Sequence, residues 1–423
     1  MKMFINGKAC DASSGETIEV TNPANGAVID TVPAATPEDV ASAVAYAKAA
    51  QKEWAKVPIH ERVDYMMKFL DLVERDKEEL ARTLSNETGK PITEARAEIG
   101  NIPIAFKAFS ERVKHLYDEV VPAGIEAGQE KTVLITRREP LGVVVAVIPF
   151  NFPCDLFDQK VAPALLSGNA VIVKPSTDNP LTLCMLTQLL GEAGVTPGAA
   201  QIVTGRGSVV GHELCANPDV DLVTLTGSTQ VGIETAEVCA KTLTHTALEL
   251  GGNDAFIVMS DADIDLATDE LIWGRMYNTG QVCCASKRFL VHKDVVDEFT
   301  KKAVEKISAL KQGDPADDAT QIGCLISEHA AKKVEEQVNL TVEQGGKIIL
   351  GGKRNGAFYE PTVIVDVPKT ADVASDMEIF GPVVPIITFE TEEEAIEIAN
   401  GSMFGLCGCV FSACLLYTSD AAD

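Results

Sequence analysis

Two side chains that can do covalent chemistry lie in one stretch of the chain. Glu249 stands within Leu-Glu-Leu-Gly-Gly (residues 248–252), and Cys283 follows Gly-Gln-Val. A cysteine thiolate attacks a carbonyl carbon readily, but the thioester that results hydrolyses slowly unless a base activates water. A carboxylate can be that base. The pair therefore indicates acyl transfer through sulfur, with Cys283 as the nucleophile and Glu249 as the general base.

Glu-Leu-Gly-Gly followed by Gly-Gln-X-Cys resembles the signature pair of the NAD(P)-dependent aldehyde dehydrogenase superfamily. Either motif alone is a weak signal, whereas both together in this order are a strong one. The resemblance implies an α/β fold with a Rossmann-like cofactor domain, an α/β catalytic domain and a small β oligomerisation arm. It also implies oxidation of an aldehyde to a carboxylic acid with NAD(P)+, through a thiohemiacetal and a thioester on Cys283, hydrolysed by water that Glu249 activates.

Cys284 is the alternative nucleophile because the two thiols are adjacent. A lone cysteine is usually a buried, inert residue, and an ordinary thiol is only ~3% ionised at neutral pH. A nearby nicotinamide cation and backbone amides could lower the pKa of the thiol. Adjacent side chains generally point in different directions, so only one should face a pocket. The family pattern places the nucleophile second after Gln281, at Cys283.

Glu249 and Asn151 each have an ordinary structural explanation as well as a catalytic one. In an apolar setting the pKa of Glu249 would rise toward ~6, which suits a base at neutral pH; alone, it could be a surface carboxylate before a turn. Asn151 follows the most apolar run of the chain. An amide there can donate to the oxygen of a tetrahedral intermediate, although Asn before Phe-Pro is also common in turns. In the family, the matching Asn forms the oxyanion hole with the backbone N–H of the nucleophile.

The resemblance also implies a set of cofactor-binding residues. They are Ile148, Pro149, Phe150, Lys174, Thr177, Gly207, Gly211, Thr226, Gly227, Ser228, Val231, Leu250, Gly251, Glu378 and Phe380. Glu378 would hold the nicotinamide ribose and Phe380 would pack on the nicotinamide, while Gly251 and Gly252 would let the backbone approach it closely. Lys174 would bind the adenosine ribose or its phosphate, although a lone lysine at a strand end is more often solvated.

The choice between NADP and NAD depends on the residues after Lys174. An acid three positions on would bind the 2′-hydroxyl and repel a 2′-phosphate. Thr177 is neutral and small, so NADP, or use of both cofactors, is favoured, while Asp178 leaves NAD open. Ser228 begins a predicted helix whose first N–H groups could hold the pyrophosphate. The usual Gly-X-Gly-X-X-Gly fingerprint is absent.

Composition excludes several classes of partner. The chain has 423 residues and 46% hydrophobic residues, with Lys+Arg 36 against Asp+Glu 62 and a net charge of −26. This balance argues against nucleic acid and anionic membrane surfaces as partners, and no apolar run is long enough for a membrane helix. The 11 cysteines are scattered, which fits reduced thiols in a cytoplasmic protein. We expect no metal site, because the His residues are isolated and no ligand motif occurs.

Short apolar runs alternate with helical patterns from residue 141 onward, which predicts a parallel, doubly wound sheet with ligands at the carboxyl ends of its strands. The predicted strands are 143–148, 170–173, 201–203, 222–226 and 256–258, and the predicted helices are 155–166, 181–192, 209–216 and 231–242. Thr36 and Pro37 open an earlier helix as N-cap and first residue. Further helices are predicted at 61–83 and 92–117, and a β-hairpin at 120–139.

These elements predict a division into domains. Residues 1–119 and 141–250 form the dinucleotide-binding domain, 120–140 the hairpin, and 251–411 the catalytic thiol domain. In the family an arm at the hairpin pairs with a neighbouring subunit, which implies a homodimer or homotetramer; an ordinary hairpin on its own sheet is the alternative. Residues 412–423 match nothing in the family and look like a translated sequencing adapter, so we expect a non-native tail.

The substrate is expected to be a small aldehyde of the succinate semialdehyde, lactaldehyde or glyceraldehyde 3-phosphate type. Relatives that act on short acidic aldehydes often carry Arg where this chain has Gln159, and Asp158 beside it weakens any case for a carboxylate-binding site. One alternative function is a coenzyme A-acylating aldehyde dehydrogenase, which would not need Glu249. Another is a truncated, non-catalytic scaffold.

Overall fold

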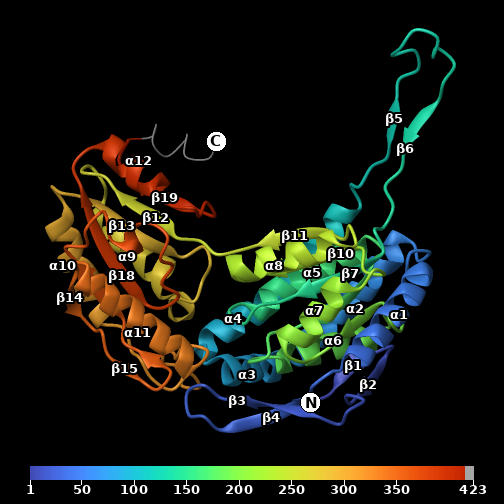
Figure 1. Ribbon diagram of the computed structural model, residues 1–423, viewed down its shortest axis with the longest axis horizontal. Helices are drawn as coiled ribbons and strands as arrows, with labels where there is room; N and C mark the ends of the chain where they lie inside the picture. The colour runs from blue at the N-terminus through green and yellow to red at the C-terminus, as the bar shows by residue number, and fades with distance from the viewer. Residues whose placement is uncertain (415–423) are drawn as a thin grey trace. The chain divides into compact units, whose positions relative to one another are not determined.

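The computed structural model describes residues 1–414 (Figure 1). The chain forms two compact units. Unit 1 comprises Met1–Val20, Asp30–Leu80 and Arg96–Glu249, and unit 2 comprises Thr21–Ile29, Ala81–Ala95 and the chain from Leu250 onward. The main crossing between the units therefore lies between Glu249 and Leu250. Of the predicted non-native tail, 412–423, residues 415–423 lie outside the described part.

Unit 1 is built on a seven-stranded sheet with the order β11-β10-β7-β8-β9-β1-β2. Its strands are β1 Met3–Ile5, β2 Lys8–Cys10, β7 Val143–Val147, β8 Ala170–Lys174, β9 Ala200–Ile202, β10 Leu222–Thr226 and β11 His245–Glu249. The five strands from β7 to β11 run parallel, while β1 is antiparallel to β9 and β2. The strand order reverses between β7 and β10, which is where doubly wound sheets bind ligands. The predicted parallel sheet is confirmed.

Helices form two groups around this sheet, one containing α1, α7 and α8 and the other α2, α5 and α6. The helices are α1 Pro37–Trp54, α2 Ile59–Arg75, α5 Pro153–Leu166, α6 Leu181–Glu192, α7 His212–Ala216 and α8 Thr229–Ala240; α3 Lys77–Thr88 and α4 Ile92–Val113 each cross from one unit to the other. Every residue of β8 is buried, as expected for a strand covered on both faces. Thr36 caps α1 through a capping box with Asp39, and Pro37 is its first residue, as predicted.

Three predicted helices have other boundaries in the structure, and one strand was not predicted. The helix predicted at 92–117 ends at Val113. The helix predicted at 61–83 is two helices, because the chain leaves helical geometry at Asp76 (φ −101°, ψ 10°). The helix predicted at 209–216 begins as a π-helix, Gly207–Gly211, before α7. The strand β11 was not predicted at all. It lies at the edge of the sheet and none of its residues is fully buried, so it lacks the apolar run by which the other parallel strands are recognised.

Unit 2 contains a six-stranded sheet with the order β14-β17-β18-β13-β12-β19. Its strands are β12 Asp254–Val258, β13 Ser286–His292, β14 Lys347–Leu350, β17 Thr362–Val365, β18 Val383–Phe389 and β19 Gly408–Phe411. Its main helices are α9 Ile264–Met276, α10 Val296–Ser308, α11 Glu328–Glu343 and α12 Glu392–Asn400. Phe256 anchors the core, with ring centroids 4.9 Å from Phe289 and 6.3 Å from Phe299. The strands β12 and β13 are parallel neighbours. The segment before β13, which carries Cys283, is therefore anchored to the sheet.

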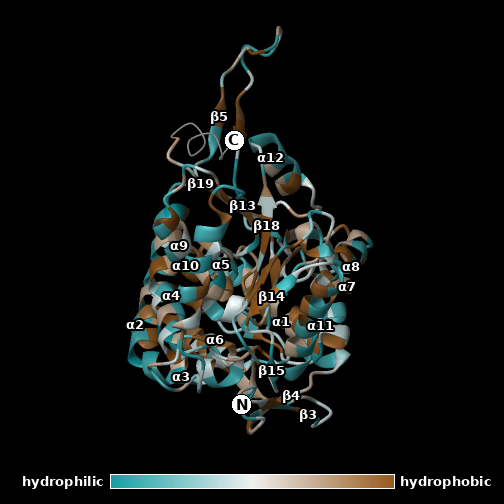
Figure 2. Cartoon of the chain, turned by 90° about the vertical axis from the view of Figure 1, so that its left-hand side faces the viewer, coloured by the Kyte–Doolittle hydropathy of each residue, from teal (hydrophilic) through white to brown (hydrophobic). Residues whose placement is uncertain are grey.

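The predicted hairpin is present and projects from unit 1 (Figure 1). Strands β5 Glu119–Val121 and β6 Leu134–Thr136 are antiparallel, with Val120 opposite Ile135. Hydrophobic residues run along both strands (Figure 2), and they are exposed: Val120 by 71%, Val133 by 77% and Ile135 by 59%. Two short strands cannot bury such residues by themselves. Within residues 1–414, no helix combines the length and apolar character needed to cross a lipid bilayer.

Candidate active site

The turn before Cys283 has an unusual backbone. Asn278 (φ 49°), Thr279 (φ 55°) and Gly280 (φ 75°) are three consecutive residues in the left-handed region, which residues other than glycine rarely adopt. A side chain at Gly280 would also collide with the carbonyl of Gly381. Such strain is stable only where neighbouring groups fix it, and it is concentrated at functional sites. The glycine of the Gly-Gln motif is thus required by the backbone conformation and by the close approach of Gly381.

Gln281 fixes this turn through its side chain. Its Nε2 donates to the carbonyl of Asn278 at 3.1 Å, and its Oε1 accepts from the backbone N–H of Ile326 at 2.9 Å. Asn278 Nδ2 donates in return to the carbonyl of Gln281 at 3.3 Å. Gln281 is 2% exposed, so a side chain that lacks either the donor or the acceptor would leave a buried backbone group unsatisfied. Gln281 therefore positions the segment that presents the thiol.

Cys283 is half-buried and Cys284 is exposed, and both are free thiols. A hydrogen bond between the two side chains raises the pKa of Cys283 and lowers the pKa of Cys284, while burial also opposes ionisation of Cys283. The charge of Lys287 lowers the pKa of both thiols. The thiolate of Cys284 is therefore stabilised by the S–H group of Cys283. In the free protein Cys284 is thus the more readily ionised thiol of the pair, with the S–H group of Cys283 as its hydrogen-bond donor.

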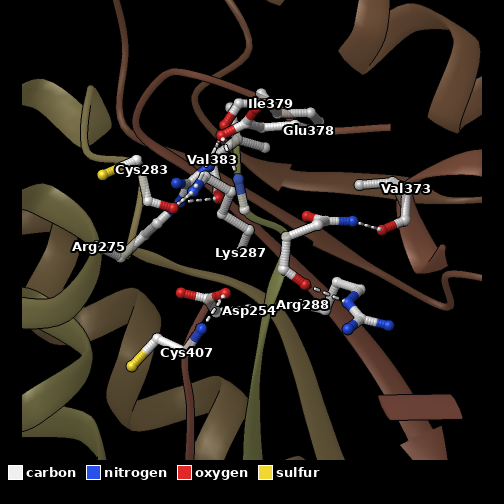
Figure 3. Close-up of polar contacts among 12 residues, drawn as sticks. Asp254, Arg275, Cys283, Lys287, Arg288, Val373, Glu378, Ile379, Val383 and Cys407 are labelled. Atoms are coloured by element: carbon white, nitrogen blue, oxygen red, sulfur yellow. Dashed lines mark hydrogen bonds and ion pairs between the residues drawn. The ribbon is translucent and has the colours of Figure 1, made fainter. Parts of the chain in front are cut away.

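Three buried cations surround the thiol segment: Arg275 and Lys287 are each 1% exposed and Arg288 is 2% exposed. Their donors reach main-chain oxygens (Figure 3). Arg275 donates to Ile379 at 2.8 Å and Val383 at 2.6 Å, Lys287 to Cys283 at 2.5 Å, and Arg288 to Asn253 at 2.6 Å, Ala374 at 3.1 Å, Ile398 at 2.8 Å and Ala399 at 2.8 Å. No sequence motif indicated these cations, because only their distant backbone partners reveal their role.

The glycine pair, Glu378 and Cys283 are brought together in unit 2. Glu378 Oε1 lies 3.2 Å from Lys287 Nζ and accepts from the N–H of Gly252 at 3.4 Å. A Cβ atom on Gly251 would lie 2.7 Å from Glu378 Oε2, and one on Gly252 would lie 2.7 Å from the carbonyl oxygen of Cys283. Gly252 therefore has no room for a side chain against a main-chain oxygen, and a side chain at Gly251 would have to displace the Glu378 carboxylate. Lys287 Nζ also lies 5.9 Å from the centroid of the Phe380 ring.

In unit 1, Glu249 is the last residue of β11 and is paired with Thr226, the last residue of β10. Its backbone carbonyl accepts from the N–H of Gly227 at 3.0 Å. The side chain is exposed, so the apolar setting expected for a base of raised pKa is not present around it. Glu249 nevertheless stands at the carboxyl end of the sheet, the edge at which parallel sheets place their functional groups.

Lys160 on α5 is a buried partner of this carboxylate that the sequence analysis missed. It is 7% exposed, and its Nζ donates to Thr224 Oγ1 at 3.0 Å. Burial lowers the pKa of Lys160 to about 8, and the negative charge of Glu249 opposes that effect. Glu249 therefore lies close enough to Lys160 for its negative charge to favour the ammonium form of the lysine. A lysine within a helical pattern carries no signal in the sequence that separates it from a solvated one.

Asn151 occupies the loop that follows β7 and precedes α5. It is 6% exposed. Ile148 N–H donates to the carbonyl of Lys174 at 3.0 Å, and Asn179 Nδ2 donates to the carbonyl of Phe150 at 2.9 Å. These bonds hold the loop to β8 and to the segment that follows it, so Asn151 is fixed at the same edge of the sheet as Glu249.

A cavity of about 390 Å³ lies at the carboxyl ends of β7, β8 and β10. It is lined by Val147, Lys174, Gly207, Ser208, Gly211, His212, Cys215, Leu225, Val231, Glu234, Thr235 and Val238. Of the predicted cofactor residues, Lys174, Gly207, Gly211 and Val231 line it. Ile148, Pro149, Phe150, Thr177, Thr226, Gly227 and Ser228 are not in this lining, although they follow or end the same strands. His212 and Glu234 are lining residues that no sequence motif indicated.

The cavity fits part of a dinucleotide. Valine and leucine side chains supply apolar walls for a flat ring, and Lys174 supplies a cation that is 4% exposed. Burial lowers the pKa of Lys174 to about 8. Ser228 caps α8 by accepting from the N–H of Val231 at 3.4 Å, and the other amides of the first helical turn have no partner within the helix. Among residues 1–414, no group of three or more His, Cys, Asp or Glu side chains is arranged to hold a metal ion.

A sequence profile described as the Aldehyde dehydrogenase family matches residues 10–421. The chain belongs to the aldehyde dehydrogenase family. Membership confirms the predicted fold class and the predicted enzyme class, an NAD(P)-dependent oxidoreductase acting on aldehydes. The match extends into the segment predicted to be a non-native tail, whose origin stays a prediction.

Relatives of known name cover most of this aldehyde dehydrogenase. It is 38% identical over 420 residues to a D-glyceraldehyde dehydrogenase (NADP(+)) of Picrophilus torridus, covering 97% of this chain and 84% of the relative. It is 38% identical over 406 residues to a succinate-semialdehyde dehydrogenase [NADP(+)] of Escherichia coli, covering 95% and 83%. A crystal structure of a succinate-semialdehyde dehydrogenase from Burkholderia pseudomallei is similar with a TM-score of 0.96 at 35% identity, covering 99% of this chain and 86% of that chain.

Proposed function

We propose that this aldehyde dehydrogenase oxidises a small aldehyde to the carboxylic acid through a thioester on Cys283 that water hydrolyses. The observation that carries this proposal is the assembly in unit 2 of Cys283, the glycine pair and Glu378, which lie far apart in the sequence. In unit 1, Glu249 and Asn151 lie at one edge of the sheet, which supports their proposed roles as base and oxyanion donor.

Each residue has a role in the proposed cycle. The Cys283 thiolate attacks the aldehyde carbon, and Asn151 donates a hydrogen bond to the oxyanion that forms. A bound nicotinamide would supply the acceptor for the hydride of this carbon, which leaves a thioester on Cys283. Glu249 then removes a proton from a water molecule that attacks the thioester, and the thiolate of Cys283 leaves as the acid forms. The exposed Glu249 side chain is accessible to water, as this step requires.

NADP, or both NADP and NAD, is the proposed cofactor. Thr177 is neutral, and its Oγ1 donates to the carbonyl of Gly205 at 3.4 Å. Because threonine has no carboxylate, this side chain would not repel a 2′-phosphate. Lys174 lines the cavity with a positive charge. Two relatives carry NADP(+) in their names. Lys174 would hold the phosphate or ribose, and the first turn of α8 would hold the pyrophosphate.

The proposed substrate class is a small aldehyde. The relatives are named for D-glyceraldehyde and for succinate semialdehyde, and these represent a polyhydroxylated and an anionic substrate. On α5, Asp158 is 1% exposed, and burial, with the charges of Asp155 and Glu98, raises its pKa. Gln159 beside it is uncharged, where relatives that act on short acidic aldehydes often carry arginine. This uncharged side chain favours a neutral, hydroxylated aldehyde such as glyceraldehyde or lactaldehyde over succinate semialdehyde.

The coenzyme A-acylating reaction is the alternative, and turnover that depends on coenzyme A would identify it. The presence of Glu249, a base that only hydrolysis needs, favours the hydrolytic reaction.

We further propose that the hairpin of β5 and β6 joins subunits into a homodimer or homotetramer, because its exposed apolar strands have nothing in their own unit to cover them.

A panel of aldehydes tests the proposal. The purified 423-residue chain is mixed with glyceraldehyde, lactaldehyde or succinate semialdehyde, with NADP+ or NAD+, and without coenzyme A. We expect absorbance of the reduced nicotinamide with at least one aldehyde and formation of the free acid. Absence of reduction with every pair, from a folded protein, would contradict the proposed function.

A further inference from the structure

We propose that Lys287 is a positioning residue that ties the nucleophile segment to the carboxylate of Glu378. This inference rests on the proposed function, together with the family resemblance, which implies that Glu378 holds the nicotinamide ribose. Lys287 is the second residue of β13, four positions after Cys283. Its role would be to place the thiol and the cofactor-binding carboxylate at a constant separation.

The contacts of the ammonium carry this inference. Lys287 Nζ donates to the carbonyl oxygen of Cys283 at 2.5 Å and lies 3.2 Å from Glu378 Oε1 (Figure 3). In the same view the sulfur of Cys283 points away from the lysine while its carbonyl faces it. The lysine therefore holds the backbone of the nucleophile and leaves the thiol itself available.

Burial makes this arrangement demanding. Lys287 is 1% exposed and Glu378 is 22% exposed, and a buried ammonium is strongly unfavourable unless it is paired and hydrogen-bonded. Desolvation lowers the pKa of Lys287, and the charges of Glu378 and Asp254 oppose it. Arg275 and Arg288 are the other cations nearby, and both bind main-chain oxygens. Glu378 is the one carboxylate within 4.0 Å of the Lys287 ammonium among the described residues.

The glycine pair packs closely against the same two groups. Gly252 lies against the carbonyl of Cys283, and Gly251 lies against Glu378 Oε2, each at a distance that leaves no room for a Cβ atom. The N–H of Gly252 also donates to Glu378 at 3.4 Å. Lys287 and the glycine pair thus contact both the Cys283 carbonyl and the Glu378 carboxylate.

Two effects follow if the ammonium is removed. The positive charge near the thiols is lost, and because that charge favours the thiolate, ionisation of Cys283 should require a higher pH. The Glu378 side chain also loses its partner and can adopt other rotamers, so the cofactor should bind more weakly. A residue with a merely structural role would not move the ionisation of the thiol.

Alkylation of Cys283 by iodoacetamide as a function of pH tests the first effect. It is measured by peptide mass mapping in a Cys284→Ala background, without aldehyde or cofactor. We expect Lys287→Met to react about tenfold more slowly near pH 7, and its rate to rise only at higher pH. Lys287→Arg keeps the charge and should restore the rate in large part. Lys293→Met, a matched exposed lysine just beyond β13, should have no effect.

A second variant keeps the test decisive. Lys287→Gln is neutral but can still donate to the Cys283 carbonyl, so it should fold where Lys287→Met does not and should show the same slow alkylation. An unchanged pH profile in a folded neutral variant would overturn the proposal. The KM for NADP+ supplies the other readout, with an expected rise of about tenfold in Lys287→Met and a smaller change in kcat. Alkylation needs no turnover, so it remains informative even if the wild-type chain oxidises no aldehyde.

Discussion

At the scale of single residues, the adjacent thiols make the clearest distinction. Cys283 is half-buried, and its carbonyl oxygen accepts a hydrogen bond from Lys287. Cys284 is exposed, and its side chain accepts a hydrogen bond from the Cys283 thiol. If Cys283 is the nucleophile, Cys283→Ala should reduce aldehyde oxidation by roughly 10³-fold or more. Cys284→Ala should stay within a few-fold of wild type. Reduced nicotinamide absorbance under saturating aldehyde measures both, and the opposite ranking of the two variants would transfer the role to Cys284.

Lys174 predicts a pH dependence of cofactor binding. Burial lowers its pKa to about 8, so the ammonium is charged below that pH and becomes neutral above it. If it binds the 2′-phosphate, the KM for NADP+ should rise as pH increases through about 8, by about tenfold for one charge-assisted bond. The KM for NAD+ should rise less. In Lys174→Arg the charge persists, so the rise should disappear; a rise of equal size in that variant would exclude Lys174 as its cause.

Asp158 predicts a pH dependence of stability. Burial, with the charges of Asp155 and Glu98, raises its pKa to about 9, whereas an unfolded aspartate titrates near ~3.9. The folded state therefore binds more protons in this window, and the contribution of Asp158 to the free energy of unfolding falls as pH rises toward about 9. Asp158→Asn removes that dependence, so its Tm relative to wild type should be higher at pH 8 than at pH 5. The exposed Asp71→Asn is the control, and an equal difference at both pH values would contradict this account.

At the scale of elements, the connection from β11 to β12 carries the glycine pair. A Cβ atom on Gly252 would meet the carbonyl oxygen of Cys283 at 2.7 Å, so Gly252→Ala should displace the nucleophile segment. We expect a loss of activity of roughly 10²-fold with a small change in Tm, because misplacement of a reacting group has an effect of that order. Gly274→Ala in α9 is the matched control, since its nearest new contact is 3.4 Å away. Full activity in Gly252→Ala would show that this contact is not needed.

Local signals made much of this architecture predictable. The Thr36 cap, the buried strands β7 and β8 and the hairpin each have a pattern that depends on neighbouring residues alone. The edge strand β11 and the break at Asp76 lack such a pattern, because they depend on tertiary pairing. The grouping of Cys283 with Glu378 was indicated only by family resemblance. Lys287, Arg275 and Lys160 were not predictable, since their partners are distant backbone or side-chain atoms that no spacing reveals.

At the scale of the whole molecule, the projecting hairpin predicts the oligomeric state. Val133 and Ile135 are exposed by 77% and 59%, and the proposed subunit contact would bury them. Ile135→Asp should shift the chain from dimer or tetramer toward monomer, because an unpaired charge in an apolar contact is unfavourable. Light scattering coupled to gel filtration measures the mass. The control is Ile104→Asp in α4, because Ile104 is also exposed, by 68%; this variant should leave the mass unchanged. A wild-type protein that is already monomeric would refute the proposal.

The three buried cations of unit 2 have a consequence for how this enzyme tolerates mutation. Arg275, Lys287 and Arg288 bind carbonyl oxygens of the main chain, and every amino acid supplies such an oxygen. Residues such as Ala374 and Ile398 can therefore be exchanged for others of similar size without removing the bond, whereas only another long donor side chain can replace a cation. A saturation library should tolerate few replacements at these three codons and many at the positions that supply the carbonyl oxygens, so natural drift can reshape the surroundings of the thiol while its support stays intact.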